Sequence, residues 1–262
     1  MLLVIDIGNT NIVMGVFKDD YLVKDWRIRT ERNSTEDEFS ILVTGLFAQS
    51  GIRFKDIDKT IISNVVPPMV TLLDSFCRKY LGQPPLWVDA RSYTGMPNLY
   101  HNPGDVGADR IVNAVAAYQK YKTSLIIIDF GTATTFDAIS ARGEYMGGAI
   151  SPGIMIAAEA LYIKASRLPR VEIFTPPERV VGRDTSGSIQ SGIIYGYAGL
   201  VDGMVERMRA EMGSNPGVIA TGGLASLMSH VSRNIEAVEP NLTLDGLRLI
   251  ANSISELKAH GS

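Results

Sequence analysis

The sequence has one cysteine, three histidines and no long apolar run, and each scarcity excludes a class of protein. Cys77 has no partner for an internal disulfide, which fits a reducing compartment. One cysteine and three histidines form no cluster with zinc-ligand spacing. No apolar stretch approaches the roughly 20 residues of a membrane span, and the amino terminus lacks a signal-peptide pattern. We therefore expect a cytoplasmic protein without a membrane partner.

The common nucleotide-binding fingerprints are also missing. No glycine is followed by lysine, which excludes a P-loop, and no two glycines are separated by a single residue, which excludes a Rossmann fingerprint. The net charge of −3 and the pI of about 5.7 give no support to a nucleic-acid partner. A length of 262 residues with 45% hydrophobic content suffices for two moderate domains.

The most informative feature present is an internal repeat. Residues 3–11 and 126–134 each form an apolar run that ends in Asp-x-Gly and continues into small hydroxyl or amide residues. A second apolar run follows each copy, so each predicts a hairpin whose turn presents a carboxylate, Asp6 or Asp129. Two such turns indicate a duplicated fold, with the phosphates of a nucleotide in a cleft between the halves.

The turn residues suit this interpretation. Gly8 and Gly131 would let the backbone approach a bulky anion closely. The side chains of Asn9, Thr10 and Thr132, which follow these glycines, are neutral hydrogen-bond donors. Asp6 and Asp129 could merely cap their own turns, but two carboxylates in matching contexts favour a function. A carboxylate among phosphates requires a cation between them, so a metal ion is implied.

Periodicity predicts an α/β protein with mixed sheets and two domains, residues 1–121 and 122–262. Thr35 and Glu38 form a capping box at the start of the first helix. The expected strands are 2–7, 11–18, 21–29, 59–66, 86–88, 124–129, 133–140, 144–150, 218–220 and 235–238. The first expected helix begins near residue 35, and a short helix is expected after residue 223. The other expected helices cover 69–81, 108–121, 153–164, 188–212 and 243–258.

Three further segments are candidates for a site. Residues 107–110 begin a helix after a polar loop that carries Tyr100. Asp109 could be functional, or it could merely cap the helix, because the helix dipole favours an aspartate in the first turn. Arg110 could pair with an anion or be a solvated charge. Residues 147–153 run from a strand into a helix through glycines, which suits either an anion at the helix start or tight packing. Residues 221–223 repeat this pattern and suit an adenosine pocket, but glycine caps and turns are common, so this segment alone is a weak signal. Glycines interrupt the apolar helix 188–212 every three or four residues, which suits core packing or a subunit interface.

Taken together, these motifs resemble type III pantothenate kinases. The match comprises Asp6-x-Gly8-Asn9-Thr10, then 107–110, 129–134 and 147–153 in that order, and it extends through 182–185, 190–192 and 221–223. The resemblance implies a duplicated ribonuclease-H-like (actin-like) fold with the active site in the interdomain cleft, and a homodimer. It also implies that ATP phosphorylates the hydroxyl of pantothenate, the first step towards coenzyme A, with Mg²⁺ and a monovalent cation, K⁺ or NH₄⁺.

The resemblance also implies residue roles. Asp109 would be the general base, Asp129 would bind the monovalent cation and Asp6 would lie near magnesium. Asp184 stands where an Asn is common in the family. The ATP-binding residues would be Asp6, Ile7, Gly8, Asn9, Thr10, Asn11, Ile12, Val13 and Thr132; the pantothenate-binding residues would be Tyr100, Gly107, Ala108, Asp109, Arg110 and, from the partner subunit, Thr185.

The chemistry agrees with this assignment, because phosphoryl transfer needs positioning, charge neutralisation and one carboxylate to accept the hydroxyl proton. Without a P-loop lysine, neutralisation falls to cations. Two alternatives stay open: another small-molecule kinase or phosphohydrolase of the superfamily, and a nucleotide-binding regulator such as a transcription accessory factor. The intact Asp109 and the absence of a basic patch argue against the regulator.

Overall fold

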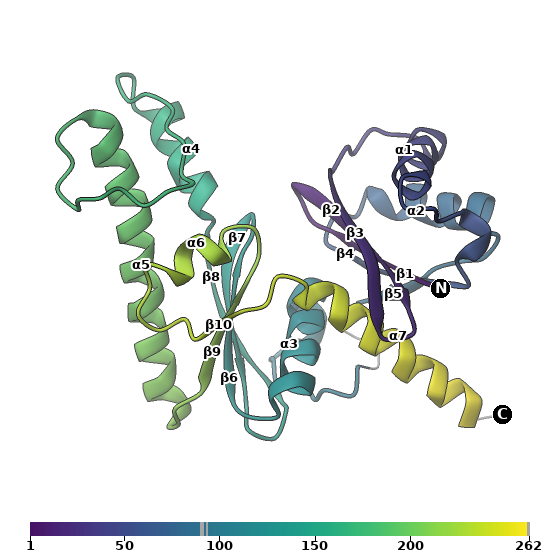
Figure 1. Cartoon of the computed structure of the whole chain (residues 1–262). Helices are drawn as coiled ribbons and strands as arrows, with labels where there is room; N and C mark the ends of the chain where they lie inside the picture. Colours follow the sequence, from purple (N-terminus) through teal and green to yellow (C-terminus); the bar gives the residue numbers. More distant parts are fainter. Residues whose placement is uncertain (90–91, 93, 261–262) are drawn as a thin grey trace. The chain divides into compact units, whose positions relative to one another are not determined.

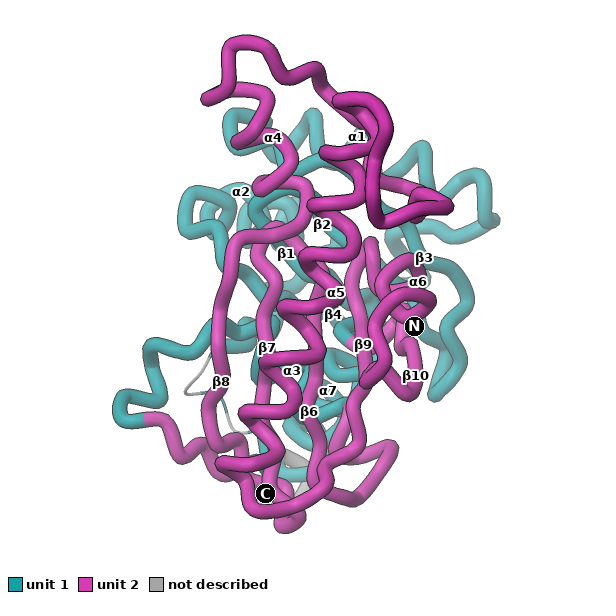
Figure 2. The backbone as a smooth tube through the Cα atoms, turned by 90° about the vertical axis from the view of Figure 1, so that its left-hand side faces the viewer, with its two compact units in different colours: residues 1–96, 101–116, 243–262 teal, residues 97–100, 117–242 magenta. Residues whose placement is uncertain are grey.

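A computed structural model describes residues 1–89, 92 and 94–260 of the chain. The chain forms two compact units, shown in different colours in Figure 2: unit 1 comprises residues 1–96, 101–116 and 243–262, and unit 2 comprises residues 97–100 and 117–242. Each unit contains a five-stranded mixed sheet with helices packed on it (Figure 1). Among the described residues, no helix is both long and apolar enough to cross a membrane.

The sheet of unit 1 has the order β3-β2-β1-β4-β5. The central strand β1 is antiparallel to β2 and parallel to β4. The strands are β1 (Leu2–Ile7), β2 (Asn11–Lys18), β3 (Tyr21–Arg29), β4 (Lys59–Asn64) and β5 (Leu86–Val88), and the helices that contribute to this unit are α1 (Glu36–Ala48), α2 (Met69–Phe76), α3 (Ala108–Tyr121) and α7 (Leu242–His260).

The sheet of unit 2 repeats this plan. Read from its other edge the order is β8-β7-β6-β9-β10, and β6 is antiparallel to β7 and parallel to β9. The duplicated α/β fold expected from the sequence repeat is therefore confirmed. The elements are β6 (Leu125–Phe130), β7 (Ala133–Ile139), β8 (Tyr145–Pro152), α4 (Ile154–Lys164), α5 (Thr185–Met212), β9 (Gly217–Thr221), α6 (Ala225–Ser229) and β10 (Ala237–Val238).

Strand alternation fixes the direction of the first turn carboxylate. In β1, Leu3, Ile5 and Ile7 enter the apolar core beneath α1 and α2, whereas Val4 enters a second core with α3 and α7. Asp6 has the same parity as Val4, so its side chain lies on the face of the sheet that α3 and α7 cover.

Side chains that hydrogen-bond to nearby backbone N–H groups set several element ends. The Thr35–Glu38 capping box is confirmed at the start of α1. Strand β4 ends at Asn64 rather than continuing to residue 66, because the Asn64 side chain accepts a hydrogen bond from the Val66 N–H at 2.7 Å. The helix expected over 69–81 is α-helical only in α2, and it continues as a π-helical turn, Cys77–Leu81.

The compact units differ from the predicted ranges because the last helix, α7, packs within unit 1. Its Gly246 lies against α3 so closely that an added Cβ would sit 2.2 Å from the Val112 carbonyl oxygen. The predicted division between residues 121 and 122 follows the strand repeat and stays a prediction.

The contact between α7 and α3 can be tested at this glycine. We expect Gly246→Ala to lower the free energy of unfolding by roughly 1–3 kcal/mol, because the methyl group meets a backbone carbonyl that has no room to move. Gly45→Ala in α1 is the matched control: nothing lies within 4 Å of its Cβ position, so alanine should stabilise by up to about 1 kcal/mol. Denaturant unfolding of both variants measures this; equal stabilisation by the two alanines would contradict the close packing.

Candidate functional site

The β1–β2 turn of unit 1 is the hairpin that the first repeat predicts. The Gly8 N–H donates to the Asn11 carbonyl oxygen at 3.0 Å, and a Cβ on Gly8 would approach the same oxygen to 3.1 Å. Two residues that the sequence analysis did not single out support the turn. Thr30 donates its hydroxyl to the Gly8 carbonyl at 2.7 Å, and Arg32 donates to the Asn9 side chain at 3.0 Å. The segment that follows β3 therefore holds the turn in place.

Asp6 lies beside a buried hydroxyl. It is in parallel register with Ser63 of β4, so the two side chains lie on the same face of the sheet. Ser63 is fully buried, and its hydroxyl has no hydrogen-bond partner within the described part of the chain. Together, the carboxylate and the hydroxyl place oxygen ligands at the end of the central strands, which is the donor chemistry that Mg²⁺ prefers.

The start of α3 lies at the same end of the unit 1 sheet. The Val65 N–H donates to the Ile7 carbonyl at 3.1 Å, directly before the Gly8 turn. A Cβ on Gly107 would lie 3.9 Å from the Val65 side chain. Val65 thus connects the Asp6 turn to the first turn of the helix that carries Asp109. The structure brings these two sequence motifs of unit 1 together.

Burial raises the pKa of Asp109, and the backbone N–H and positive charge of Arg110 partly oppose this increase. The Asp109 carboxylate accepts a hydrogen bond from the Arg110 N–H at 2.9 Å, so it satisfies one of the free amides of the first helical turn. Arg110 is only 6% exposed, which excludes the interpretation of a solvated surface charge. A half-buried carboxylate with a raised pKa is a stronger base than a solvated one.

In unit 2, the β6–β7 turn meets the strand-to-helix turn before α4. The Gly153 N–H donates to the Thr132 carbonyl at 3.1 Å, and a Cβ on Gly153 would lie 2.2 Å from that oxygen. Only glycine fits at position 153, because any side chain would overlap this carbonyl oxygen. The predicted glycine segment 147–153 therefore reaches the predicted turn that contains Gly131 and Thr132.

The glycine segment 221–223 of unit 2 lies directly against Asp129. Thr221 is in parallel register with Asp129. The following Gly222 has a φ of +90°, and a Cβ there would lie 2.5 Å from an Asp129 carboxylate oxygen. In the sequence alone, segment 221–223 is a weak signal, but in the structure its Gly222 lies directly against the Asp129 turn.

Tyr100 ends the short segment 97–100, which belongs to unit 2, although residues 1–96 and 101–116 on either side of it belong to unit 1. Its segment pairs with the edge strand β8: Leu99 and Pro97 exchange backbone hydrogen bonds with Tyr145, both at 2.8 Å. The Tyr100 ring lies 6.4 Å from the Tyr145 ring, and a Cβ on Gly147 would contact it at 3.5 Å.

Tyr145 is itself anchored by a buried charge. Its hydroxyl donates to fully buried Asp137 at 2.7 Å. The sequence analysis missed both residues, although an aspartate within the apolar strand 133–139 was the available signal.

Thr185 is the first residue of α5 and is exposed. The helix begins three residues before the predicted residue 188, because the Asp184 side chain caps it by accepting a hydrogen bond from the Gly187 N–H at 2.8 Å. Asp and Asn are equally good helix caps. The aspartate at this position therefore preserves the local structure that an asparagine would give.

No group of three or more His, Cys, Asp or Glu side chains gathers as a metal site in the residues that the structure describes. This composition fits Mg²⁺ held by one or two carboxylates together with phosphate oxygens and water. Each turn presents a single carboxylate, Asp6 in unit 1 and Asp129 in unit 2, and such a carboxylate can hold a cation together with phosphate oxygens and water. A preformed protein cage is not required.

The duplicated topology and the paired strand-end carboxylates define the class of actin-like ATPases and sugar kinases. Solved structures share the fold. An inorganic polyphosphate/ATP-glucomannokinase from Arthrobacter sp. strain KM aligns with a TM-score of 0.50 at 15% identity, covering 98% of both chains. A Campylobacter jejuni protein described as a Baf family transcriptional activator aligns with a TM-score of 0.61 at 17% identity, covering 97% of this chain and 99% of that one.

Sequence comparison identifies the family within this class. The model of the type III pantothenate kinase family matches residues 2–207. The type III pantothenate kinase of Desulfatibacillum aliphaticivorans is 63% identical over 97% of this chain and 99% of its own length. That of Desulforapulum autotrophicum is 62% identical over 96% and 97%. The chain belongs to the type III pantothenate kinase family.

Proposed function

We propose that the chain phosphorylates the hydroxyl of pantothenate with ATP, the first step of coenzyme A biosynthesis, and that Asp109 is the general base. Membership of the type III pantothenate kinase family supports the reaction, its use of ATP with a divalent metal and pantothenate as substrate. The position of Asp109 carries the residue assignment. Its half-buried carboxylate begins α3 at the end of the sheet where the Asp6–Gly8 turn lies.

We further propose that residues 6–13 of the β1–β2 hairpin and Thr132 contact ATP. In the β1–β2 turn, the glycine and the small polar side chains leave space for phosphate oxygens. Asp6 and the neighbouring Ser63 hydroxyl would hold magnesium, which neutralises charge on the phosphates when it is bound. Tyr100 and residues 107–110 would bind pantothenate. The placement of the nucleotide in a cleft between the two halves stays a prediction.

The principal alternative is a nucleotide-binding regulator on the same fold, the kind of role that the description of the Campylobacter jejuni neighbour names for that protein. Its 17% identity supports the shared fold alone. Burial raises the pKa of the Asp109 carboxyl, and carboxyls with raised pKa values are enriched at catalytic sites, where they act as bases. This observation favours the kinase.

The assignment of Asp109 predicts the behaviour of Asp109→Asn. The amide still accepts the Arg110 N–H but accepts no proton from pantothenate, so turnover should fall roughly 10²–10⁴-fold. A coupled assay of ADP release, with and without pantothenate, measures this, and calorimetry should show unchanged ATP binding.

Stability provides the control for this variant. The pKa of Asp109 is raised in the folded state, so the ionised carboxylate lowers the free energy of unfolding at pH values above the folded-state pKa. This penalty shrinks as the pH falls through the folded-state pKa and is gone below the ordinary value of 3.8. Asp109→Asn should therefore melt no lower than the natural chain at neutral pH, with any gain shrinking in acid. Normal turnover together with a lowered melting temperature would show that Asp109 serves only the helix start.

We also propose that Asp129 binds a monovalent cation, K⁺ or NH₄⁺. The Asp129 carboxylate lies in contact with the backbone at Gly222, at the end of β6. The chain has no P-loop lysine to neutralise the charge of the phosphates, so a cation has to do so. Exchanging potassium for sodium should sharply reduce turnover in the natural chain. In Asp129→Asn the rates in the two salts should become similar. Equal rates in sodium and potassium for the natural chain would remove the proposed role.

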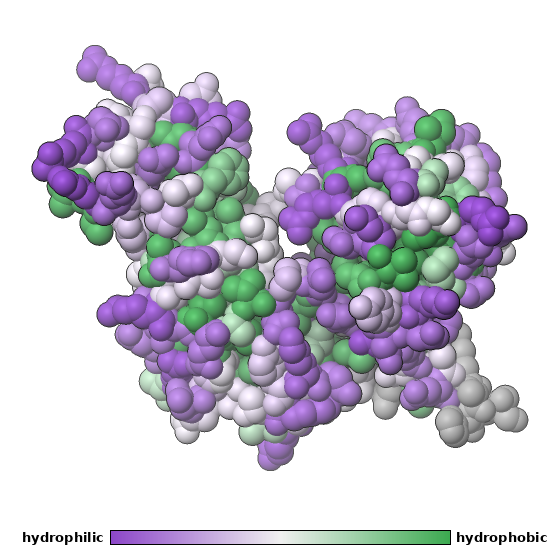
Figure 3. Space-filling view, in the orientation of Figure 1, coloured by the Kyte–Doolittle hydropathy of each residue, from purple (hydrophilic) through white to green (hydrophobic). Residues whose placement is uncertain are grey.

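The homodimer is likewise proposed, with α5 as its main contact. Gly192, Gly196 and Gly199 are exposed along α5. Apart from the nearby backbone of α5 itself, no atom of the described residues lies within 4 Å of the positions that their Cβ atoms would take. Figure 3 shows hydrophobic surface on the side of unit 2 that carries α4 and α5. Exposed large apolar side chains of unit 2 include Ile150, Ile156, Tyr162, Ile163, Phe174, Val180 and Val181. Apolar patches of this kind mark protein interfaces.

Light scattering tests the dimer. The natural chain should have twice the mass of a 28.5 kDa monomer, and Gly196→Arg should shift it towards the monomer because a second backbone would meet the added side chain. Gly45→Arg, at an equally open and exposed helix position in α1, should stay dimeric. A fully active monomer would overturn both the dimer and the contribution of Thr185 from a partner subunit.

A further inference from the structure

A buried carboxyl group in β7 has no part in the proposed reaction. Asp137 is fully buried and stands between apolar residues in this strand of unit 2. It accepts hydrogen bonds from the Tyr145 hydroxyl at 2.7 Å and from the Thr135 hydroxyl at 3.3 Å. Burying a carboxyl group is costly even when it is hydrogen-bonded, and an apolar side chain would fill the same space without that cost. This contact therefore calls for a role other than packing.

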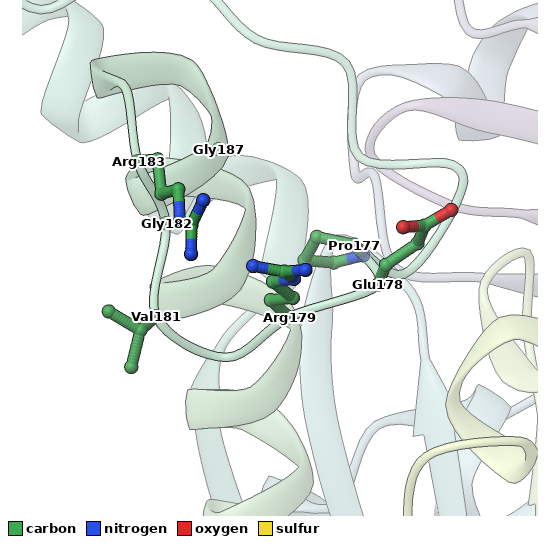
Figure 4. A pocket seen from close by; sticks show the side chains of 7 residues that line it. All are labelled: Pro177, Glu178, Arg179, Val181, Gly182, Arg183 and Gly187. Carbon is green, nitrogen blue, oxygen red and sulfur yellow. The ribbon is translucent and has the colours of Figure 1, made fainter.

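Asp137 lies on the face of the unit 2 sheet opposite α5. The preceding residue, Phe136, packs into the apolar core that contains Tyr197 of α5. Successive side chains of a strand point to opposite faces, so Asp137 faces away from that helix. The loop before α5, which Figure 4 shows beside the helix, is bonded to α5 by three side chains. The Asp137 contact therefore does not belong to α5, the helix proposed as the main dimer contact.

Tyr145 joins Asp137 to the segment that carries Tyr100. The Tyr145 N–H donates to the Pro97 carbonyl at 2.8 Å, and the Tyr145 carbonyl accepts from the Leu99 N–H at the same distance. The fully buried Tyr145 ring lies 6.4 Å from the Tyr100 ring. One residue thus holds the segment through both its backbone and its ring.

Two further contacts place Tyr100. Its ring lies over the backbone of Gly147, where an added Cβ would approach it to 3.5 Å, and the φ of +123° at this residue favours glycine. The Tyr100 N–H donates to the Asn98 side chain at 3.0 Å, which fixes the backbone as well. The contacts that begin at buried Asp137 therefore end at the ring that is proposed to bind pantothenate.

We propose that Asp137 and Tyr145 are positioning residues that set the orientation in which Tyr100 meets pantothenate. This inference rests on the proposed function, in which Tyr100 binds that substrate. Both residues are fully buried, so they act through Tyr100 and not on the substrate. A binding side chain gives its full affinity only when the packing and hydrogen bonds behind it hold it in the productive orientation. Loosening the contact should weaken pantothenate binding and leave the transfer step unchanged.

Steady-state kinetics of Tyr145→Phe tests this assignment. The variant loses only a hydroxyl, so the KM for pantothenate should rise roughly twofold to tenfold, while kcat and the KM for ATP stay near their natural values. Tyr118→Phe is the matched control: it loses a hydroxyl bond to the Ala141 carbonyl in the same unit and should change none of these constants. Asp137→Asn should keep the KM for pantothenate low, because an amide can accept from Tyr145 and donate to Thr135.

A double variant separates positioning from a general loss of structure. Tyr100→Ala should raise the KM for pantothenate by itself, and adding Tyr145→Phe should raise it no further, because Tyr145 acts through Tyr100. Additive effects, or a fall in kcat with an unchanged KM in Tyr145→Phe, would overturn the positioning role and leave the kinase function intact. An unchanged KM in Tyr100→Ala would overturn the proposed role of Tyr100 and the positioning role with it.

Hydrogen exchange of the full chain reads the same contact without turnover. The Leu99 N–H, which donates to the Tyr145 carbonyl, should exchange faster in Tyr145→Phe than in Tyr118→Phe or the natural chain. Equal exchange in all three would overturn the positioning role whatever the kinase activity. A natural chain without pantothenate-dependent ADP release would overturn the proposed function, whereas faster exchange in Tyr145→Phe would still support the positioning of Tyr100.

Discussion

The structure depends on backbone segments that approach each other without side chains between them at the ends of the central strands. In unit 2, Gly153 contacts the Thr132 carbonyl and Gly222 contacts the Asp129 carboxylate, at distances where a Cβ would overlap both oxygens. In unit 1, Val65 bonds to the Ile7 carbonyl beside the start of α3. A methyl group at either glycine would push the turn away from its neighbour. The glycines therefore bring segments far apart in sequence to one carboxylate.

This arrangement explains how a kinase of this family can lack a P-loop. A P-loop surrounds phosphates with one continuous run of amides and a lysine. Here each unit supplies a short hairpin turn with a single carboxylate, Asp6 or Asp129, and a cation is needed to join such a carboxylate to a phosphate. In the proposed mechanism the positive charge comes from bound ions, and the buried Arg110 lies beside the proposed base.

Asp109 shows how local and tertiary effects combine on one residue. The helix start alone would favour an ionised aspartate, since the amide of Arg110 and the helix dipole both stabilise negative charge. Burial acts in the opposite direction and dominates, so the pKa is raised. Burial depends on what packs over the first turn of α3, which the sequence of residues 107–110 does not contain.

The sequence by itself determined the duplicated fold, the two hairpin turns, the capping box at Thr35 and Glu38 and the family, because these depend on local patterns and on residue spacing. The tertiary structure decided that α7 packs within unit 1, that segment 221–223 meets Asp129, and that Tyr145 and buried Asp137 support Tyr100. Each of these joins residues distant in the chain through close packing or burial. A periodic pattern shows which face of an element is apolar, but the distance between two backbones is set only when the elements pack.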